Sequence, residues 1–124
     1  MDKCCFLKKD QDFKSVYRNR KTYGNRNFTL YIRPNHTNQV RIGFSISKKV
    51  GNAVVRNRIK RRLKMLYRDH CKELKPGYDL VLVVKNNVAD LSFPQLKSAF
   101  IHIMRVSRMT NTSKRRSKSE KKNK

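Results

Sequence analysis

The stretch RIGFSISKKVGNAVVRNRIKRRLK, residues 41–64, decides both the fold and the charge of this 124-residue chain. It begins as a strand, because apolar residues recur at every second position through 39–47. It ends as a helix over 53–70, because Asn52 is a good N-cap and the later apolar residues recur at helical spacing. A strand that leads directly into a basic amphipathic helix is therefore the centre of the expected fold.

The same two periodicities predict four further elements around this stretch. They indicate a short helix over 8–18 and a strand over 27–33. Five consecutive apolar residues, 80–84, predict a strand over 78–85 that is buried on both faces. Ser92 and Gln95 form a capping box that begins a helix ending near Arg105. We expect 27–33 and 39–47 to pair as an antiparallel hairpin in an α+β sandwich, a small sheet with helices against one side.

The chain is strongly basic, with 32 Lys and Arg against 8 Asp and Glu and a net charge of +24. Between Phe13 and Arg68 there is no acidic residue, whereas this block holds 16 Lys or Arg. A block of one sign indicates a dedicated surface for a polyanion, nucleic acid first and an anionic membrane second. The same charge excludes a protein that binds cationic ligands.

All the periodic segments fit one domain over 1–106. From Ser107 onward the residues are almost all Ser, Thr, Asn, Lys and Arg, which predicts a disordered basic tail over 107–124. No apolar run approaches the ~18–20 residues that span a bilayer, and the N-terminus is too charged for a signal peptide. We therefore expect a cytoplasmic protein without a membrane partner.

The cysteines do not suggest a disulfide framework. Cys4, Cys5 and Cys71 are an odd number, and in a reducing compartment we expect free thiols. A zinc site that adds His70 is the alternative, but adjacent ligands do not match the usual spacing. The acid-free block holds no carboxylate pair and no metal-ligand set, so we expect no catalytic residue and no metal site in the protein.

Two candidate surfaces emerge. Strand alternation places Thr29, Tyr31, Arg41 and Ser45 on the polar face of the expected hairpin. Hydroxyls, a guanidinium and a ring are the parts of a platform for single-stranded nucleic acid, with an ordinary solvated face as the alternative. Phe13 and Tyr17 lie four residues apart on the first helix, where they either face this platform or simply dock the helix.

The second surface is the basic side of the helix over 53–70. Its like charges repel one another, and phosphates would compensate them because Arg offers a planar fork and Lys a point charge. Arg62 falls near the apolar arc, so its side chain must either snorkel or lie at the edge of that arc. Free N–H groups at the helix N-terminus favour anions beside the preceding lysines. The candidate nucleic-acid contacts are Lys48, Lys49, Asn52, Arg56, Asn57, Arg58, Lys60, Arg61, Lys64 and Arg68.

The stretch 41–64 closely resembles the signature of bacterial ribonuclease P protein subunits, in which a Lys-Lys-x-Gly-x-Ala-Val run precedes an Arg-Asn-Arg helix. Here the run is KKVGNAV at 48–54, and RNR stands at 56–58. Asp12-Phe13, Leu30-Tyr31 and KPGYD at 75–79 also agree. The resemblance covers about residues 6–105 and leaves the tail outside.

The resemblance implies an α+β fold with a mixed sheet of about four strands and a left-handed β-α-β crossover (ribosomal protein S5 domain 2-like). It implies a subunit that binds a catalytic RNA and the 5′ leader of precursor tRNA, while the RNA, with Mg²⁺, removes the leader by endonucleolytic cleavage. Phe13, Tyr17 and Tyr31 look like the family's cleft aromatics, and we assign Thr29, Arg41 and Ser45 to the same cleft. We expect no obligate protein partner.

Three other functions remain open on composition alone. A structural RNA-binding protein of ribosomal type would bind RNA without affecting leader cleavage. A nucleoid-like DNA binder would bind duplex DNA and RNA alike, because phosphate contacts carry no information on sequence or sugar. An autonomous nuclease would cleave without an added RNA. The expected cleft aromatics argue against the DNA binder.

Overall fold

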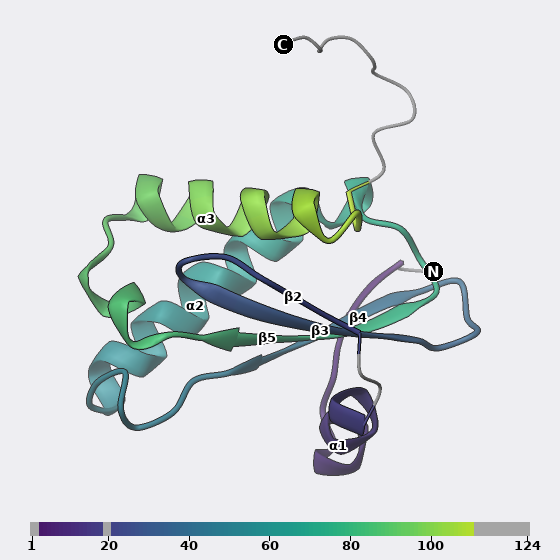
Figure 1. Ribbon diagram of the computed structural model, residues 1–124, viewed down its shortest axis with the longest axis horizontal. Helices are drawn as coiled ribbons and strands as arrows, with labels where there is room; N and C mark the ends of the chain where they lie inside the picture. The colour runs from purple at the N-terminus through teal and green to yellow at the C-terminus, as the bar shows by residue number, and fades with distance from the viewer. Residues whose placement is uncertain (1–2, 19–20, 111–124) are drawn as a thin grey trace, which may run out of the picture.

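The computed structural model describes residues 3–18 and 21–110. Five strands form one mixed sheet in the order β1-β4-β5-β3-β2. Figure 1 shows helix α1 on one face of this sheet and helices α2 and α3 on the other. The elements are β1 (Cys4–Phe6), α1 (Asp10–Arg18), β2 (Thr22–Gly24), β3 (Phe28–Pro34), β4 (Val40–Ser45), α2 (Ala53–His70), η1 (Cys71–Glu73), β5 (Tyr78–Val84), η2 (Asn86–Asp90) and α3 (Phe93–Val106). The α+β class is confirmed, with five strands rather than about four. The expectation of helices against one side only is wrong, because α1 packs on the second face of the sheet.

The expected hairpin is wrong, because β5 lies between the two strands that were to pair. β3 runs antiparallel to β5, and β4 runs parallel to it on the other side. The crossover unit is therefore β4-α2-β5. The prediction for β5 itself is confirmed, since Leu80 and Leu82 are buried toward one face of the sheet and Val81 toward the other. A strand that is apolar on both faces belongs at the centre of a sheet.

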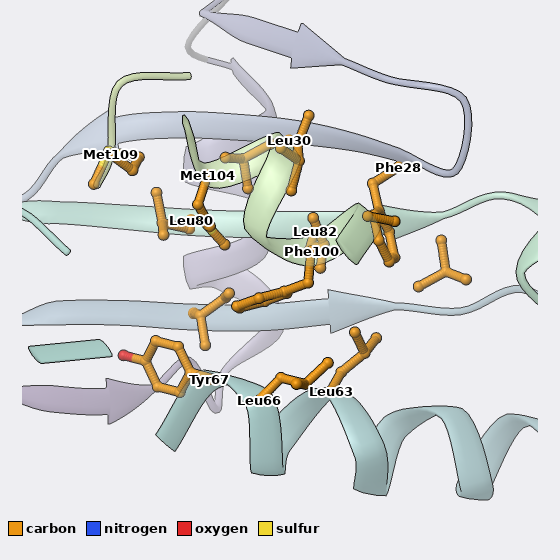
Figure 2. Close-up of a cluster of buried hydrophobic side chains, with 14 of the residues drawn as sticks. Phe28, Leu30, Leu63, Leu66, Tyr67, Leu80, Leu82, Phe100, Met104 and Met109 are labelled. Carbon is orange, nitrogen blue, oxygen red and sulfur yellow. The ribbon is translucent and has the colours of Figure 1, made fainter. Parts of the chain in front are cut away.

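The main core lies between the sheet and the α2–α3 layer (Figure 2). The two helices of this layer form from the segments that the sequence predicts to be helical. Asn52 caps α2 by accepting a hydrogen bond from the Val55 N–H at 3.0 Å, and the Ser92–Gln95 capping box begins α3. Large side chains from both layers fill it: Phe28, Leu30, Leu80, Leu82, Leu63, Leu66, Tyr67, Phe100 and Met104.

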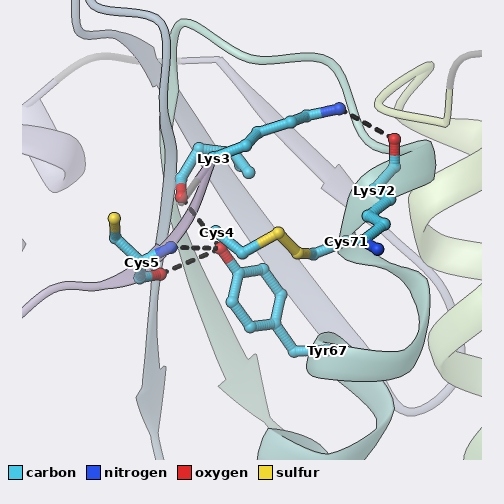
Figure 3. Close-up of a disulfide and its surroundings, with 7 residues drawn as sticks. Lys3, Cys4, Cys5, Tyr67, Cys71 and Lys72 are labelled. Atoms are coloured by element: carbon cyan, nitrogen blue, oxygen red, sulfur yellow. Dashed lines mark hydrogen bonds between the residues drawn. A yellow bond between two sulfur atoms is a disulfide. The ribbon is translucent and has the colours of Figure 1, made fainter. Parts of the chain in front are cut away.

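The short strand β1 is an edge strand that the sequence pattern did not predict. It pairs in parallel with β4 over Val40–Ile42. The buried Tyr67 of α2 reinforces it (Figure 3). Its hydroxyl accepts from the Cys5 N–H and lies within hydrogen-bond distance of the carbonyl oxygens of Cys5 (2.9 Å) and Val40 (2.8 Å), which share its single proton. Burial raises the pKa of the Tyr67 hydroxyl, so it remains a protonated donor.

Cys4 and Cys71 form a disulfide, so the expectation of free thiols is wrong for this pair. Their Cα atoms are 6.1 Å apart, within the range that a disulfide bridges. Cys5 is not part of a disulfide and remains a thiol. The alternative zinc site is also not assembled, because the described residues contain no group of three or more His, Cys, Asp or Glu side chains placed to hold a metal ion.

The ordered chain extends past the expected start of the tail. Met109 is buried in the main core, and Thr110 forms a β-bridge with Leu74. Residues 107–110 therefore belong to the folded part rather than to a disordered tail, and the rest of the expected tail, 111–124, lies outside the described residues. In the described ranges, no helix is both long and apolar enough to cross a membrane.

Candidate nucleic-acid interface

Helix α1 covers part of the sheet face opposite the main core. Val16 of α1 and Val81 of β5 are both fully buried, and Leu7 joins them in a second, small hydrophobic cluster. The cluster fixes α1 against β5, and its partly exposed neighbours are Phe13, Tyr31 and Val83. We call this side of the sheet, with α1, the α1 face.

The strand register sets which side chains share the α1 face. Because β5 lies between β3 and β4, its residues Val81 and Val83 occupy the middle of the face that was expected to be polar. Three rows cross it from β3 through β5 to β4: Arg33–Asp79–Arg41, Tyr31–Val81–Gly43 and Thr29–Val83–Ser45. The face therefore has a charged end, an aromatic centre under α1, and an end with two hydroxyls.

Phe13 lies directly over Gly43. A Cβ atom added at Gly43 would sit 2.3 Å from Cζ of the Phe13 ring, a separation that real atoms do not show. The ring therefore rests on the backbone of β4, and only glycine leaves room for it. Phe13 thus docks α1, as the second interpretation of its spacing proposed, yet it remains partly exposed at the surface.

Tyr17 and Tyr31 form an aromatic pair at the edge of α1. Their ring centroids are 4.9 Å apart with the planes at 83°, an edge-to-face contact. Tyr17 keeps 38% of its surface exposed. The structure thus brings together Phe13, Tyr17 and Tyr31 on one face, as the sequence predicted.

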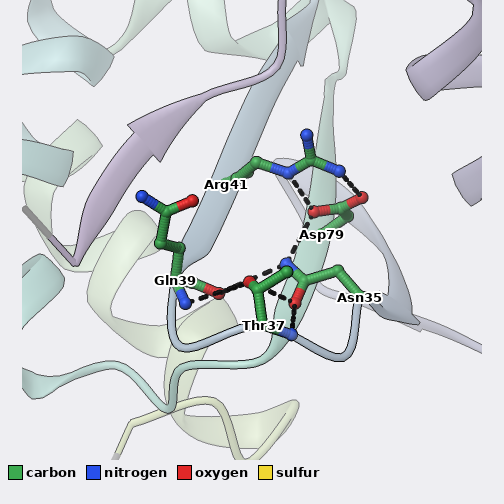
Figure 4. Close-up of polar contacts among 5 residues, drawn as sticks. All are labelled: Asn35, Thr37, Gln39, Arg41 and Asp79. Atoms are coloured by element: carbon green, nitrogen blue, oxygen red, sulfur yellow. Dashed lines mark hydrogen bonds and ion pairs between the residues drawn. The ribbon is translucent and has the colours of Figure 1, made fainter.

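Asp79 holds Arg41 in a fixed orientation at the charged end. The carboxylate is fully buried and accepts bonds from Nε (2.7 Å) and Nη2 (2.6 Å) of Arg41 and from the Asn35 amide (2.8 Å). The hydrogen bond to Asp79 raises the pKa of the Arg41 guanidinium above its ordinary value, against the effect of burial. Its third nitrogen points away from Asp79 (Figure 4).

Asp79 was not among the residues predicted for either surface, although an acid at the start of an otherwise apolar strand was a visible signal. The loop between β3 and β4 crosses the start of β5 beside it. The Asn35 N–H donates to the Gly77 carbonyl at 2.9 Å, and the Gly77 N–H donates to the Gln39 carbonyl at 2.8 Å. Gly77 has a φ of 92°, in the left-handed region that favours glycine.

The predicted contacts around α2 divide into exposed and engaged residues. Asn52 uses its side chain as the helix cap, and Arg56 Nε donates to the Gly51 carbonyl at 3.1 Å, so both have local structural roles. The exposed residues among these contacts are Lys48, Lys49, Asn57, Arg58, Lys60, Arg61 and Arg68. We call them, with Lys64, the α2 basic surface.

Aromatic rings support three cations of α2. Lys64 Nζ and Arg68 Cζ each lie 5.6 Å from the centroid of Phe6, and Arg62 Cζ lies 5.8 Å from that of Phe93. These distances are within cation–π range. Arg62 is only partly exposed, which confirms its place at the edge of the apolar arc. The role of Phe6 had no sequence signal, because it belongs to a strand of three residues.

The two surfaces meet along β4. β1 ends at Phe6, opposite Ile42, so no described strand covers the outer edge of β4 from Gly43 to Ser45. From Ser45 the chain passes through the exposed Lys48 and Lys49 into α2. An extended polyanion that leaves the α1 face at this edge would therefore meet the α2 basic surface next.

A mixed sheet with an aromatic face, joined at one edge to a basic helix, defines a small α+β protein suited to binding a polyanionic chain. The family model described as Ribonuclease P matches residues 1–108. The ribonuclease P protein component of Finegoldia magna is 46% identical over 105 residues, which cover 85% of this chain and 92% of the relative. That of Alkaliphilus oremlandii is 38% identical over 107 residues, 86% and 94% of the two chains.

The solved structure of the Staphylococcus aureus RNase P protein matches with a TM-score of 0.80 and 29% identity, over 86% of this chain and 97% of that one. The chain belongs to the ribonuclease P protein family. It is thus a component of a tRNA-processing ribonucleoprotein, and membership implies association with ribonuclease P RNA.

The contact between Gly43 and Phe13 leads to a first prediction. Gly43→Ala forces the ring off the sheet, and we expect the free energy of unfolding to fall by about 1–3 kcal/mol, as for other overpacked sites. Urea denaturation measures this change. Gly24→Ala is the matched control, because a Cβ in that strand meets nothing nearer than 3.7 Å.

A double variant isolates the contact. In a Phe13→Ala background, the effect of Gly43→Ala should shrink to that of Gly24→Ala, because the ring is gone. An undiminished effect in that background would show that Gly43 is required for some other reason.

Proposed function

We propose that the α1 face binds the 5′ leader of precursor tRNA while the α2 basic surface binds the catalytic RNA, and that the protein thereby assists removal of the leader. The observation that carries this proposal is the placement of Phe13, Tyr17 and Tyr31 on one sheet face that opens, along β4, onto the basic helix. The named residues of both surfaces are proposed contacts.

The α1 face suits a single strand rather than a duplex. Its aromatic rings offer stacking surfaces, which accept any base because every base has a π-face. Arg41 presents its third nitrogen in an orientation that Asp79 maintains. Thr29 and Ser45, both partly exposed, add hydroxyl groups at the far end of the face. Stacking without base-specific hydrogen bonds fits a leader whose sequence differs between precursors.

The α2 basic surface suits the phosphates of a folded RNA. Apart from Asn57 its residues are cations, all of them exposed except the partly exposed Lys64, and the chain carries no acid between Phe13 and Arg68 to neutralise them. Arg58 and Arg61 can each offer a planar fork to a phosphate, and the lysines offer point charges. The repulsion between these neighbouring cations would be relieved when phosphates bind, which favours the complex over the free protein.

In this proposal Mg²⁺ acts through the RNA. Mg²⁺ prefers hard oxygen ligands such as carboxylates, phosphates and water, whereas the two surfaces consist mainly of cations, hydroxyls and rings. Phosphates of the RNA subunit supply the ligands that fit the ion, and the proposed work of the protein is to bind and position RNA. We place this activity in the cytoplasm and expect no obligate protein partner.

Reconstituted cleavage tests the proposal. A bacterial ribonuclease P RNA and a precursor tRNA are incubated at low Mg²⁺ with this protein, without it, and with the protein alone. We expect leader removal to be stimulated only when the RNA and the protein are both present. Salt-sensitive RNA binding without stimulation would instead support a structural RNA-binding protein, and cleavage by the protein alone would indicate an autonomous nuclease.

Tyr31→Ala should separate leader binding from general RNA binding. Loss of one stacking platform weakens binding by about 1–3 kcal/mol, and we expect this loss for precursor tRNA but not for mature tRNA with the reconstituted holoenzyme. Dissociation constants for the two tRNAs measure the difference. Tyr31→Phe keeps the ring and should retain the preference for precursor. Equal losses for both tRNAs would remove Tyr31 from the leader site.

Arg61→Ala should reduce the salt dependence of binding to ribonuclease P RNA. If Arg61 contacts one phosphate, the slope of log K against log salt should fall by about 1. Lys97→Ala is the matched control, because Lys97 is an exposed cation on α3 and belongs to neither surface as defined above. A change of slope that is the same in the two variants would mean that only net charge matters, and not the α2 basic surface.

A further inference from the structure

A cavity of about 460 Å³ lies between β1 and the C-terminal end of α2, outside the α1 face. The Cys4–Cys71 disulfide forms part of its wall. Among the residues that the structure describes, the charged ones around it are all cations, namely Lys3, Arg68 and Lys72, and no described carboxylate lines it. A disulfide thus borders a small cavity whose described charged residues are all cations.

Two of these cations, Lys3 and Arg68, are held at the cavity by contacts with residues of its wall. Lys3 Nζ donates to the Lys72 carbonyl at 2.8 Å, which spans the mouth from β1 to η1 (Figure 3). Arg68 lies over the Phe6 ring, another wall of the cavity. Of the described acids next to these cations in the sequence, Glu73 lies 3.7 Å from His70 Nδ1, and neither it nor the exposed Asp69 lines the cavity. An anionic molecule that enters would therefore be attracted by the cations that line the cavity.

We propose that Cys4 and Cys71 are a thiol–disulfide exchange site for anionic low-molecular-weight thiols and their disulfides. In the oxidising direction, the Cys4 thiolate attacks one sulfur of a small disulfide RSSR, and one RS⁻ leaves. The Cys71 thiolate then attacks the Cys4 sulfur of the mixed disulfide, and the second RS⁻ leaves. Two protein thiols are oxidised, one RSSR is reduced to two RSH, and the protons pass from the protein thiols to the leaving thiolates.

Burial assigns the order of the two cysteines. Cys71 is 1% exposed, so a reagent in the cavity cannot reach it first, whereas Cys4 is only partly buried. Cys5 is a thiol next to Cys4 in sequence, but its sulfur projects to the other side of β1 (Figure 3). Cys4 is thus the sulfur that the reagent meets, Cys71 resolves the mixed disulfide, and Cys5 takes no part.

The exchange would add or remove a covalent link between the N-terminal edge strand and α2. Without it, β1 is held by three residues of parallel pairing, the Tyr67 hydrogen bonds and the contacts of Phe6 with Phe44 and Tyr67. These contacts preserve the fold, but a three-residue edge strand opens more readily than one tied at its start. Amide hydrogen exchange at Cys5 and Leu7 should therefore be faster in the reduced protein.

The test compares two small disulfides on the fully reduced full-length protein. Glutathione disulfide carries carboxylates, and hydroxyethyl disulfide is neutral. After quenching with acid, peptide mapping by mass spectrometry follows the Cys4–Cys71 bond. We expect this bond to form in both reactions. The ratio of the rate with glutathione disulfide to the rate with hydroxyethyl disulfide should be about tenfold or more higher for the protein than for a model thiol, as for other electrostatically steered encounters.

Charge removal should abolish the preference. In Lys3→Gln and Lys72→Gln, the advantage of glutathione disulfide should fall several-fold while the rate with the neutral reagent stays the same. Lys14→Gln, a matched loss of charge on α1, should change neither rate. Raising the salt concentration with the unaltered protein should also reduce the preference by screening, a readout that does not depend on whether the variants fold.

Several results would overturn the proposal. One is equal relative rates for the two reagents with the unaltered protein. Another is an adduct that resides on Cys5 instead of passing from Cys4 to Cys71. A third is a loss of rate in the lysine variants that is equal for the charged and the neutral reagent, since it would show that the lysines only shape the cavity.

Discussion

Strand β5 is packed between two apolar layers, and the rest of the molecule is arranged around that packing. On one side, Leu80 and Leu82 complete the main core under α2 and α3, and on the other, Val81 receives Val16 of α1. If β5 were an edge strand, α1 would have no apolar surface to pack against at the centre of the sheet. The aromatic face would then lose its support, because Phe13 and Tyr17 belong to α1.

Asp79 shows how the same strand also organises the polar part of the molecule. Burying its carboxylate without hydrogen-bond partners would cost free energy of folding. Arg41 of β4 and Asn35 of the loop after β3 donate the hydrogen bonds that it needs. The arrangement serves both sides: the acid gains its hydrogen bonds, and the arginine gains a fixed direction. A leader site built from these residues would therefore be largely preorganised, which reduces the entropy lost when an RNA strand binds.

Much of the fold follows from local patterns, and the errors concern pairing between distant segments. Helix α2 begins at Ala53 and ends at His70 as predicted, because its cap and apolar spacing are local signals. The hairpin was wrong, although the apolar run of β5 already required two neighbouring strands. β1 and β2 have three residues each, too few for a periodicity. For the site, strand alternation could predict which side chains share a face of the sheet. The packing of Phe13 on Gly43 could not be predicted, because it depends on how α1 crosses the sheet.

The position of β5 also has a consequence for how the chain folds during synthesis. β3 and β4 emerge from the ribosome first, but their shared neighbour follows only after the whole of α2; paired residues Phe28 and Val84 are 56 positions apart. Until then the two strands have no partner at the centre of the sheet and present open edges. Such non-local pairing slows folding. The nascent chain must therefore remain extended and soluble over most of its length, a period in which its excess of positive charge resists self-association.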